Sequence, residues 1–430
     1  MSYPELNKER KEKLIFTLKR RILPFAFVLY FFNMMDRVNV GFAALTMNAE
    51  LGITPEQYGS IASIFFLAYL IFQMPSNFVL PKLGAKHWIG SLFVGWGLVT
   101  TLTFFADSPT YIFVTRFIIG MLEAGFFPGM IFYIACWFPQ EERAHASGLF
   151  LVSAAISQLI AAPISGWIVG NINFAGYAGW RWLFVIEGLP TIFIGISIFF
   201  FMCNTPKEAK WLDEEEKAWL MGSLAEEKAS HAKREKSRLR DVFMDLKLWQ
   251  MALAYMLIQG ACQAPAFWMP KQLQSLDPTL TNTMIGFIMM TPFVMGALAG
   301  GPWGRHSDRT GERKWHTAVP FLLCMISFLG VAFITWLPLR VFFLGLYGAG
   351  IFAAYGPFFA AAPRLLPPAG LAVGIAFINT FSGIGALFAN KAIGYFESAF
   401  STTHSLLFLA FLCLLAFLIV LLTAIPREER

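Results

Sequence analysis

Charged side chains are scarce in this chain of 430 residues. They make up 14% of it, whereas 57% of the residues are hydrophobic and 16% are aromatic. Soluble domains carry about 25% charged residues, because a surface exposed to water needs them. The composition therefore excludes an ordinary soluble protein and predicts a chain whose outer surface contacts lipid.

Cysteine and histidine are also few. The five cysteines lie singly, and the six histidines show no spacing typical of metal ligands. There is no G-x-x-x-x-G-K-[ST] loop, no G-x-S-x-G motif and no H-E-x-x-H motif. We therefore expect a protein that is not an enzyme, with no catalytic residue, no metal site and no cofactor apart from a coupling proton.

Long apolar runs are abundant instead. A bilayer core about 30 Å thick is crossed by a helix of about 20 mostly apolar residues. Twelve stretches meet this criterion, at roughly 22–46, 58–80, 88–106, 110–137, 144–170, 181–202, 248–270, 282–303, 316–336, 340–362, 371–396 and 403–425. The sequence predicts an all-α membrane protein with twelve transmembrane helices.

Basic residues predict the orientation of these helices. Most of the 33 lysines and arginines lie in residues 1–21, in residues 203–247 and in other loops on the same side, whereas the opposite loops hold only Arg181, Lys271 and Arg340. Basic loops stay in the cytoplasm, so we expect a multi-pass inner-membrane protein with both termini cytoplasmic. The basic loops that face the inner leaflet account for the pI of about 9.0. Nucleic acid is therefore not an expected partner.

A charged segment divides the chain into two halves. Residues 203–247, which include the run Lys233–Lys236, are typical of a solvated linker helix. The expected parts are a cytoplasmic N-terminal tail (1–21), a six-helix bundle (22–202), the linker (203–247), a second six-helix bundle (248–425) and a cytoplasmic tail (426–430). Gly84 and Gly311, each followed by tryptophan four residues later, occupy equivalent loops, which favours a repeat with a cavity between the bundles.

Four ionisable residues lie deep within the apolar stretches, where a charge costs about 2.5–3.5 kcal/mol. Asp36 and Arg37 lie in the first stretch, and Arg116 and Glu123 lie on nearly the same face of the fourth. Asn33 shares a helix face with Arg37. At about 1.5 Å per residue, Asp36 and Arg37 fall at a depth similar to that of Arg116, with Glu123 deeper, so we expect the charges of the two stretches to meet.

The two signs of charge suit different tasks. An arginine stays protonated and can hold a carboxylate through two hydrogen bonds, so Arg37 and Arg116, with Asn33 beside them, are predicted to bind an organic anion. A carboxyl group in a low-dielectric cavity can bind and release protons near neutral pH, so Asp36 and Glu123 are predicted to couple proton movement to transport. The alternative is a buried salt-bridge network that only fixes helix packing.

Uncharged polar residues in the stretches are further candidates. They could bind hydroxyl groups of a cargo or bridge helices. These residues are Tyr69, Gln158, Gln259, Gln263, Tyr355 and Asn379. We interpret Lys391, near the end of its stretch, as a side chain that reaches the membrane surface, and Glu187 as structural.

Several short motifs are distinctive when taken together. They are Met35–Ala43, Pro75–Asn77, Glu123–Gly129, Trp137–Pro139, Ser307–Arg313 and Tyr355–Phe358. Over roughly residues 22–425 the chain resembles the anion:cation symporter branch of the major facilitator superfamily. That branch includes transporters for galactonate, rhamnonate, tartrate, phthalate and hydroxyphenylacetate.

The resemblance implies the major facilitator fold of two six-helix bundles. It implies that Asp36 and Glu123 handle the proton and that Arg37 and Arg116 attend the anion. It also implies that Tyr69 and Asn379 line the cavity, as their counterparts do in sugar-acid members. The chain differs from some sugar-acid members in having alanine rather than glutamine at position 154, and from many members in having Asn-Lys rather than Gly-Pro at 390–391.

We therefore expect a secondary active transporter that imports a small organic anion, either a sugar acid or another carboxylate. The expected mechanism is proton symport through alternating access, by a protein that functions as a monomer in the lipid bilayer. An organic-anion exchanger or uniporter on the same scaffold is the alternative.

Overall fold

The computed structural model describes residues 6–232, 243–365 and 371–426, and in these ranges the chain is helical, without a β-strand. The main helices are α1 (Lys8–Glu50), α2 (Pro55–Leu83), α3 (Ala85–Leu102), α4 (Pro109–Glu123), α5 (Phe126–Trp137), α6 (Gln140–Asn171), α7 (Gly179–Phe201), α8 (Glu214–Ala232), α10 (Leu246–Leu276), α11 (Asn282–Ile288), α12 (Thr291–Thr310), α13 (Lys314–Phe333), α14 (Leu337–Leu365), α15 (Leu371–Ala399) and α16 (Thr402–Leu422). The 3-10 helices are η1 (Thr103–Phe105), η2 (Phe174–Gly176) and η3 (Pro206–Glu208). The predicted all-α class is confirmed.

Among the described residues, 10 segments are long and apolar enough to cross a membrane. They are α2, α3 with η1, the pairs α4–α5 and α11–α12, and the single helices α6, α7, α13, α14, α15 and α16. The helices α1 and α10 are equally long but carry polar residues in their middle, Asp36 and Arg37 in α1 and Gln259 and Gln263 in α10. With these two helices, the predicted twelve crossings are confirmed.

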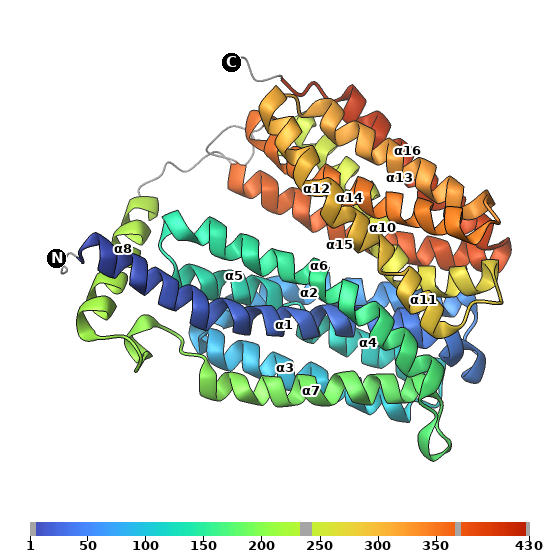
Figure 1. The fold of residues 1–430 in the computed structure, drawn as a ribbon, viewed down its shortest axis with the longest axis horizontal. Helices are drawn as coiled ribbons and strands as arrows, with labels where there is room; N and C mark the ends of the chain where they lie inside the picture. Colours follow the sequence, from blue (N-terminus) through green and yellow to red (C-terminus); the bar gives the residue numbers. More distant parts are fainter. Residues whose placement is uncertain (1–5, 233–242, 366–370, 427–430) are drawn as a thin grey trace.

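The crossings form two groups that follow the order of the chain (Figure 1). In the first group α1 packs against α6 and α7, α3 packs against α7, and α2 packs against α4. In the second group α10 packs against α15 and α16, and α14 packs against α12 and α13. The start of α1, α8 and the loops after α2 and α12 lie at one end of the molecule in Figure 1, which we call the α8 end. The loops before α2, α4 and α11 lie at the opposite, far end.

At the far end the two groups touch through glycines. Gly59 of α2 faces Gly394 of α15, and Gly166 of α6 faces Gly286 of α11; a Cβ atom added to the first glycine of either pair would lie 2.9 Å from the Cα atom of the second. Backbones approach this closely only where side chains are missing. Toward the α8 end the two groups diverge in Figure 1, so the far end is the closed end of the molecule.

A side chain at Gly166 is therefore expected to open the far end. In Gly166→Val, the new Cβ atom would lie 2.6 Å from the carbonyl oxygen of Asn282, and relief of that clash requires the two groups to separate. We expect a cysteine introduced at Asn282 to react several-fold faster with a membrane-impermeant maleimide, with the labelled site identified by mass spectrometry. Gly148→Val is the matched control, because Gly148 lies in the same helix and, apart from that helix's own backbone, no atom of the described residues lies within 4 Å of the added Cβ. Equal labelling in the two variants would show that this seam does not hold the far end closed.

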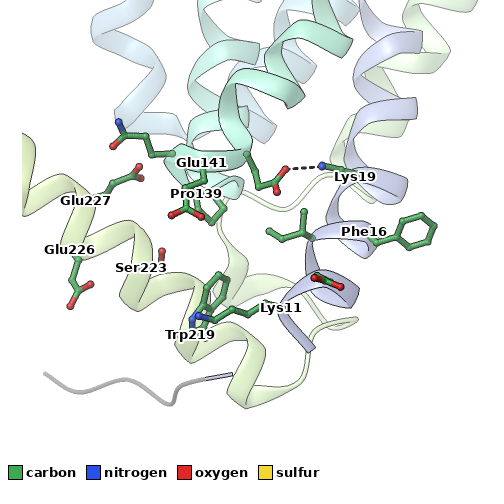
Figure 2. A pocket seen from close by; sticks show the side chains of 13 residues that line it. Lys11, Phe16, Lys19, Pro139, Glu141, Trp219, Ser223, Glu226 and Glu227 are labelled. Carbon is green, nitrogen blue, oxygen red and sulfur yellow. Dashed lines mark ion pairs between the residues drawn. The ribbon is translucent and has the colours of Figure 1, made fainter. Parts of the chain in front are cut away.

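Most of the described part of the predicted N-terminal tail (1–21) is helical and belongs to α1. The helix α1 begins at Lys8 because its first turns pack on other elements of the α8 end. Figure 2 shows Lys11 beside Trp219 of α8, with its Nζ atom 5.2 Å from the ring centre. Lys19 forms an ion pair with Glu142 of α6 at 2.7 Å. These contacts extend the first crossing well beyond its apolar stretch.

The predicted linker contains the helix α8. Leu220 of α8 is fully buried, whereas Glu214 and Glu215 are exposed, so one face of the helix is packed and another is solvated. The charged run Lys233–Lys236, like residues 1–5 and 427–430 of the predicted tails, lies outside the described residues.

Two crossings are interrupted at proline-dependent breaks. The helix α4 ends at Glu123 and α5 begins at Phe126. A proline ring clashes with the carbonyl group four residues earlier, and Pro128 stands four residues after Ala124, at the break. Pro292, the second residue of α12, stands four residues after Ile288, the last residue of α11. The first break leaves Glu123 at the end of a helix, inside the first group.

Candidate functional site

The helices α1 and α4 meet at Glu123, whose side chain has no exposed surface. Its Oε2 atom accepts a hydrogen bond from Nδ2 of Asn33 at 3.0 Å and lies 3.3 Å from Nη2 of Arg37. Its Oε1 atom has no hydrogen-bond partner among the described residues. Asn33 and Arg37 stand about one helical turn apart, so a single carboxylate oxygen engages both residues of α1.

Arg37 is the part of this cluster that reaches an open space. Its side chain is 18% exposed, and its guanidinium carbon lies 5.5 Å from the ring centre of Phe65 and 5.4 Å from that of Tyr69. These contacts fit cation–π geometry. The two rings support the guanidinium group on one side while Glu123 holds it on another.

Arg116 is buried without a polar partner. Its side chain is 1% exposed, and none of its three guanidinium nitrogens makes a hydrogen bond among the described residues. Its guanidinium carbon lies 4.7 Å from the ring centre of Phe65 and 5.8 Å from that of Phe267, a residue of α10 in the second group. Cation–π contacts alone offset little of the cost of burying a charge. Glu123 and, more weakly, Asp36 act on Arg116 electrostatically and offset part of this cost.

Asp36 is buried in the first group and is 1% exposed. Its Oδ1 atom accepts a hydrogen bond from Nδ2 of Asn39 at 3.1 Å, and its Oδ2 atom has no partner in the described part of the chain. Trp96 and Thr100 of α3 lie beside it without forming a hydrogen bond of normal geometry. A buried carboxylate with so few partners is costly when it is charged, which suits a group that takes up a proton.

A further buried acid, Glu187 of α7, lies close to Asp36. Its Oε1 atom accepts a hydrogen bond from Oγ of Ser165 at 2.7 Å, and its Oε2 atom has no partner within the described ranges. Asn39 stands beside both Asp36 and Glu187. The hydrogen bond to Ser165 joins α6 to α7, in keeping with the structural interpretation of Glu187.

A cavity of about 530 Å³ lies between the two groups. Residues of α1, α5 and α6 line it on one side, and residues of α10, α12 and α14 line it on the other. Arg37 is the one charged side chain among the described residues that line it. The volume is within the range of small-molecule binding sites, about 300–1,000 Å³.

Polar side chains on the second-group wall of the cavity bond mainly to one another. Gln259 donates to the hydroxyl group of Tyr255 at 2.6 Å and accepts from the hydroxyl group of Tyr355 at 3.2 Å. The thiol of Cys262 lies 3.3 Å from the same Tyr355 hydroxyl. The hydroxyl group of Tyr347 donates to the backbone oxygen of Cys262 at 3.0 Å. These bonds leave the wall with few free polar groups.

The structure places the predicted residues at different distances from the cavity. Arg37 and Gln263 line it. Four predicted residues are buried behind Arg37 and do not line the cavity, namely Asn33, Asp36, Arg116 and Glu123. Tyr69 lies against the guanidinium group of Arg37. Asn379 is exposed on α15 and is not among the lining residues. Lys391 donates to Ser60 of α2 at 2.7 Å, across the far-end seam.

Some lining residues escaped the sequence analysis, namely Tyr255, Cys262 and Tyr347. Tyr255, Gln259, Cys262 and Gln263 stand at helical spacing on one face of α10. That stripe could have marked the cavity wall. The same spacing also fits helix–helix packing, and only the fold distinguishes the two.

The described residues form neither a cluster of potential metal ligands nor a disulfide. No group of three or more histidine, cysteine, aspartate or glutamate residues there could hold a metal ion. The cysteines are free thiols.

Two groups of six crossings, closed at one end around a central cavity with buried charges, are the architecture of a membrane transporter that works by alternating access. The sequence model of the Major Facilitator Superfamily matches residues 26–390. The chain belongs to this superfamily.

Related proteins agree with this assignment. The "Putative tartrate transporter" of Agrobacterium vitis is 34% identical over 99% of this chain and 98% of its own length. The "Inner membrane transport protein RhmT" of Escherichia coli is 33% identical over 95% of this chain and 94% of its own length. These relatives confirm the resemblance to the organic-anion branch.

A solved structure shows the same fold. A bacterial homologue of the human lysosomal transporter Spinster, in an inward-facing and occupied conformation, superimposes with a TM-score of 0.78. The alignment covers 95% of this chain and 98% of that chain at 14% sequence identity.

Proposed function

We propose that the protein imports a small organic anion together with a proton across the cell inner membrane. The observation that carries this proposal is that Arg37, the charged residue exposed in the cavity, is also the partner of the buried Glu123. Arg37 can therefore pair either with Glu123 or with a carboxylate of the substrate. A proton on Glu123 leaves Arg37 free to hold a substrate carboxylate, and loss of that proton restores the competition.

The orientation of the protein gives this competition a direction. Basic loops favour a cytoplasmic α8 end, with both termini on that side, so the closed far end faces outward. On the cytoplasmic side, where the proton concentration is lower, Glu123 loses its proton and recaptures Arg37. The ion pair between them at 3.3 Å is then the arrangement after release of the anion.

Arg116 serves the anion in the outward-facing state. The ring of Phe267 covers it from the second group, and rocking of the two groups to open the far end would withdraw that ring. A buried cation without a hydrogen-bond partner is then uncovered toward the outer side, where it attracts an incoming carboxylate. Arg37 would receive the same carboxylate when the far end closes.

The remaining predicted residues support these steps. Asp36, within electrostatic range of Arg116, is proposed as a second proton carrier that balances this arginine when no anion is present. Asn33 orients Glu123, Tyr69 supports Arg37, and Gln263 supplies a polar contact in the cavity. Asn379 is proposed to contact the substrate only in another conformation.

The names of the relatives support an organic anion as cargo, since one of them includes tartrate. The protein is proposed to function as a monomer in the bilayer, with the proton as coupling ion and no other cofactor. No catalytic role is proposed for any residue.

Uptake into proteoliposomes tests symport directly. An inward proton gradient of one pH unit corresponds to a factor of about ten at equilibrium. We expect it to drive accumulation of radiolabelled carboxylate to about that ratio, with alkalinisation of the outside medium. The exchanger or uniporter alternative predicts counterflow of the same size at every pH and no accumulation driven by the gradient.

A further inference from the structure

The charge of the cavity limits the charge of its cargo. Arg37 is the one charged side chain lining the cavity among the described residues, and Arg116 is sealed behind Phe65 and Phe267. A substrate with two carboxylates would place the second one against tyrosine, phenylalanine and glutamine side chains. Burying a charge without a partner is costly, so the cavity fits a monocarboxylate.

The hydrogen-bonding capacity of the cavity limits the number of hydroxyl groups on the cargo. Tyr347 and Tyr355 donate their hydroxyl groups to the Cys262 backbone and to Gln259. Tyr255 accepts from Gln259 through its hydroxyl oxygen, which leaves its own O–H as one donor for a cargo. Among the described residues, the lining amides with the fewest hydrogen bonds are those of Gln158, which contacts the Met34 sulfur at 4.0 Å, and of Gln263. A polyhydroxylated acid would leave several of its hydroxyl groups unpaired, which a binding site penalises.

The second-group wall presents aromatic rings to the remaining space. Phe293 and Phe352 pack edge-to-face with ring centres 6.4 Å apart, and Phe352 and Tyr355 do so at 6.5 Å. All three line the cavity, as does Phe127 on the first-group wall. Aromatic side chains pack against another ring in stacked or edge-to-face contact. An aromatic ring of the cargo that fills this space leaves few of its own polar groups without a hydrogen bond.

We infer that the transported anion is an aromatic monocarboxylate, its carboxylate on Arg37 and its ring between the aromatic walls, with room for one polar ring substituent at Gln158 or Gln263. This inference rests on the proposed function and narrows its cargo from organic anions in general. It excludes dicarboxylates and polyhydroxylated sugar acids as preferred substrates.

A ligand panel tests the inference on the purified full-length protein in detergent. The probes are benzoate and 4-hydroxybenzoate against tartrate, which adds a second carboxylate, and gluconate, which adds hydroxyl groups. Benzamide, which keeps the ring and lacks the charge, is the control for the carboxylate. By isothermal titration calorimetry we expect the two aromatic acids to bind at least about tenfold more tightly than tartrate, gluconate and benzamide.

A pair of phenylalanine variants tests the role of the wall. Phe352→Leu keeps an apolar side chain but removes the ring, and we expect it to weaken benzoate binding about fivefold or more. The matched control is Phe388→Leu, because Phe388 is 65% exposed on the outer side of α15 and is expected to leave benzoate binding unchanged. Size-exclusion profiles of both variants show whether they are folded, and the panel on the unaltered protein does not depend on them.

Tighter binding of tartrate or gluconate than of both aromatic acids would overturn this inference while leaving anion symport in place. Benzoate binding that Phe352→Leu and Phe388→Leu reduce equally would also overturn it. If none of the four acids bound, the inference would be overturned, whereas the proposed function would still be decided by proton-driven uptake of other carboxylates into proteoliposomes.

Discussion

Replacing Glu123 by glutamine is expected to abolish proton-driven accumulation while leaving exchange intact. Glutamine has nearly the shape of the protonated acid, so Arg37 stays free for the anion at every pH. With a gradient of one pH unit, the unaltered protein should reach an accumulation of about tenfold. The variant should bring the internal concentration only to the external one. Counterflow of labelled against unlabelled anion should continue.

The matched control for this variant is Glu142→Gln. Glu142 also forms an ion pair with a basic residue, Lys19, but at the α8 end and partly in water, where such pairs contribute little. Accumulation by this control should equal that of the unaltered protein. If Glu123→Gln still concentrated the anion against a gradient, Glu123 would not be the coupling group.

Replacing Arg37 by alanine is expected to remove anion binding. The variant leaves the cavity without a cation among its described lining residues. Truncating one partner of a buried hydrogen-bonded charge pair costs about 2–5 kcal/mol, or roughly 30-fold to several thousand-fold in affinity. Arg37→Lys keeps the charge but loses the planar group that can bind a carboxylate through two hydrogen bonds, so its affinity should be intermediate. Titration calorimetry with the best-binding acid measures both effects.

Arg20→Ala is the control for the arginine variants. Arg20 lies in the same helix but is exposed at the α8 end, and its removal should change affinity less than twofold, since exposed charges contribute little. An Arg37→Ala protein that bound the anion within threefold of the unaltered protein would rule out Arg37 as the docking group.

Much of the fold could be predicted from the sequence because lipid imposes a simple rule. Each crossing needs about 20 apolar residues with internally bonded backbone, and every predicted stretch coincides with a helix or a broken helix pair. The start of α1 at Lys8 could not be predicted in this way. Its early turns are held by Trp219 and other residues about 200 positions away, which local patterns do not reveal.

The charge cluster could be predicted in part. Helical rise fixes depth, and it places Asp36 and Arg37 level with Arg116, so the sequence indicates that the two helices bring charges together. It places Glu123 deeper, and the pairing of Glu123 with Arg37 at 3.3 Å is seen only in the structure. Depth says nothing about which face of a helix turns toward the cavity, so the sequence does not predict which of the four charged side chains reaches it. In the structure only Arg37 reaches it, since Phe267 from the second group covers Arg116.

Proton uptake on anion binding tests the central claim most directly, that Glu123 and the substrate compete for Arg37. Calorimetry of the best-binding acid in buffers with different ionisation enthalpies counts the protons taken up. Linkage predicts uptake approaching one proton per anion near the pH at which Glu123 is ionised in the empty protein, and none in Glu123→Gln. Anion binding without proton uptake in the unaltered protein, or with the same uptake in Glu123→Gln, would contradict the account.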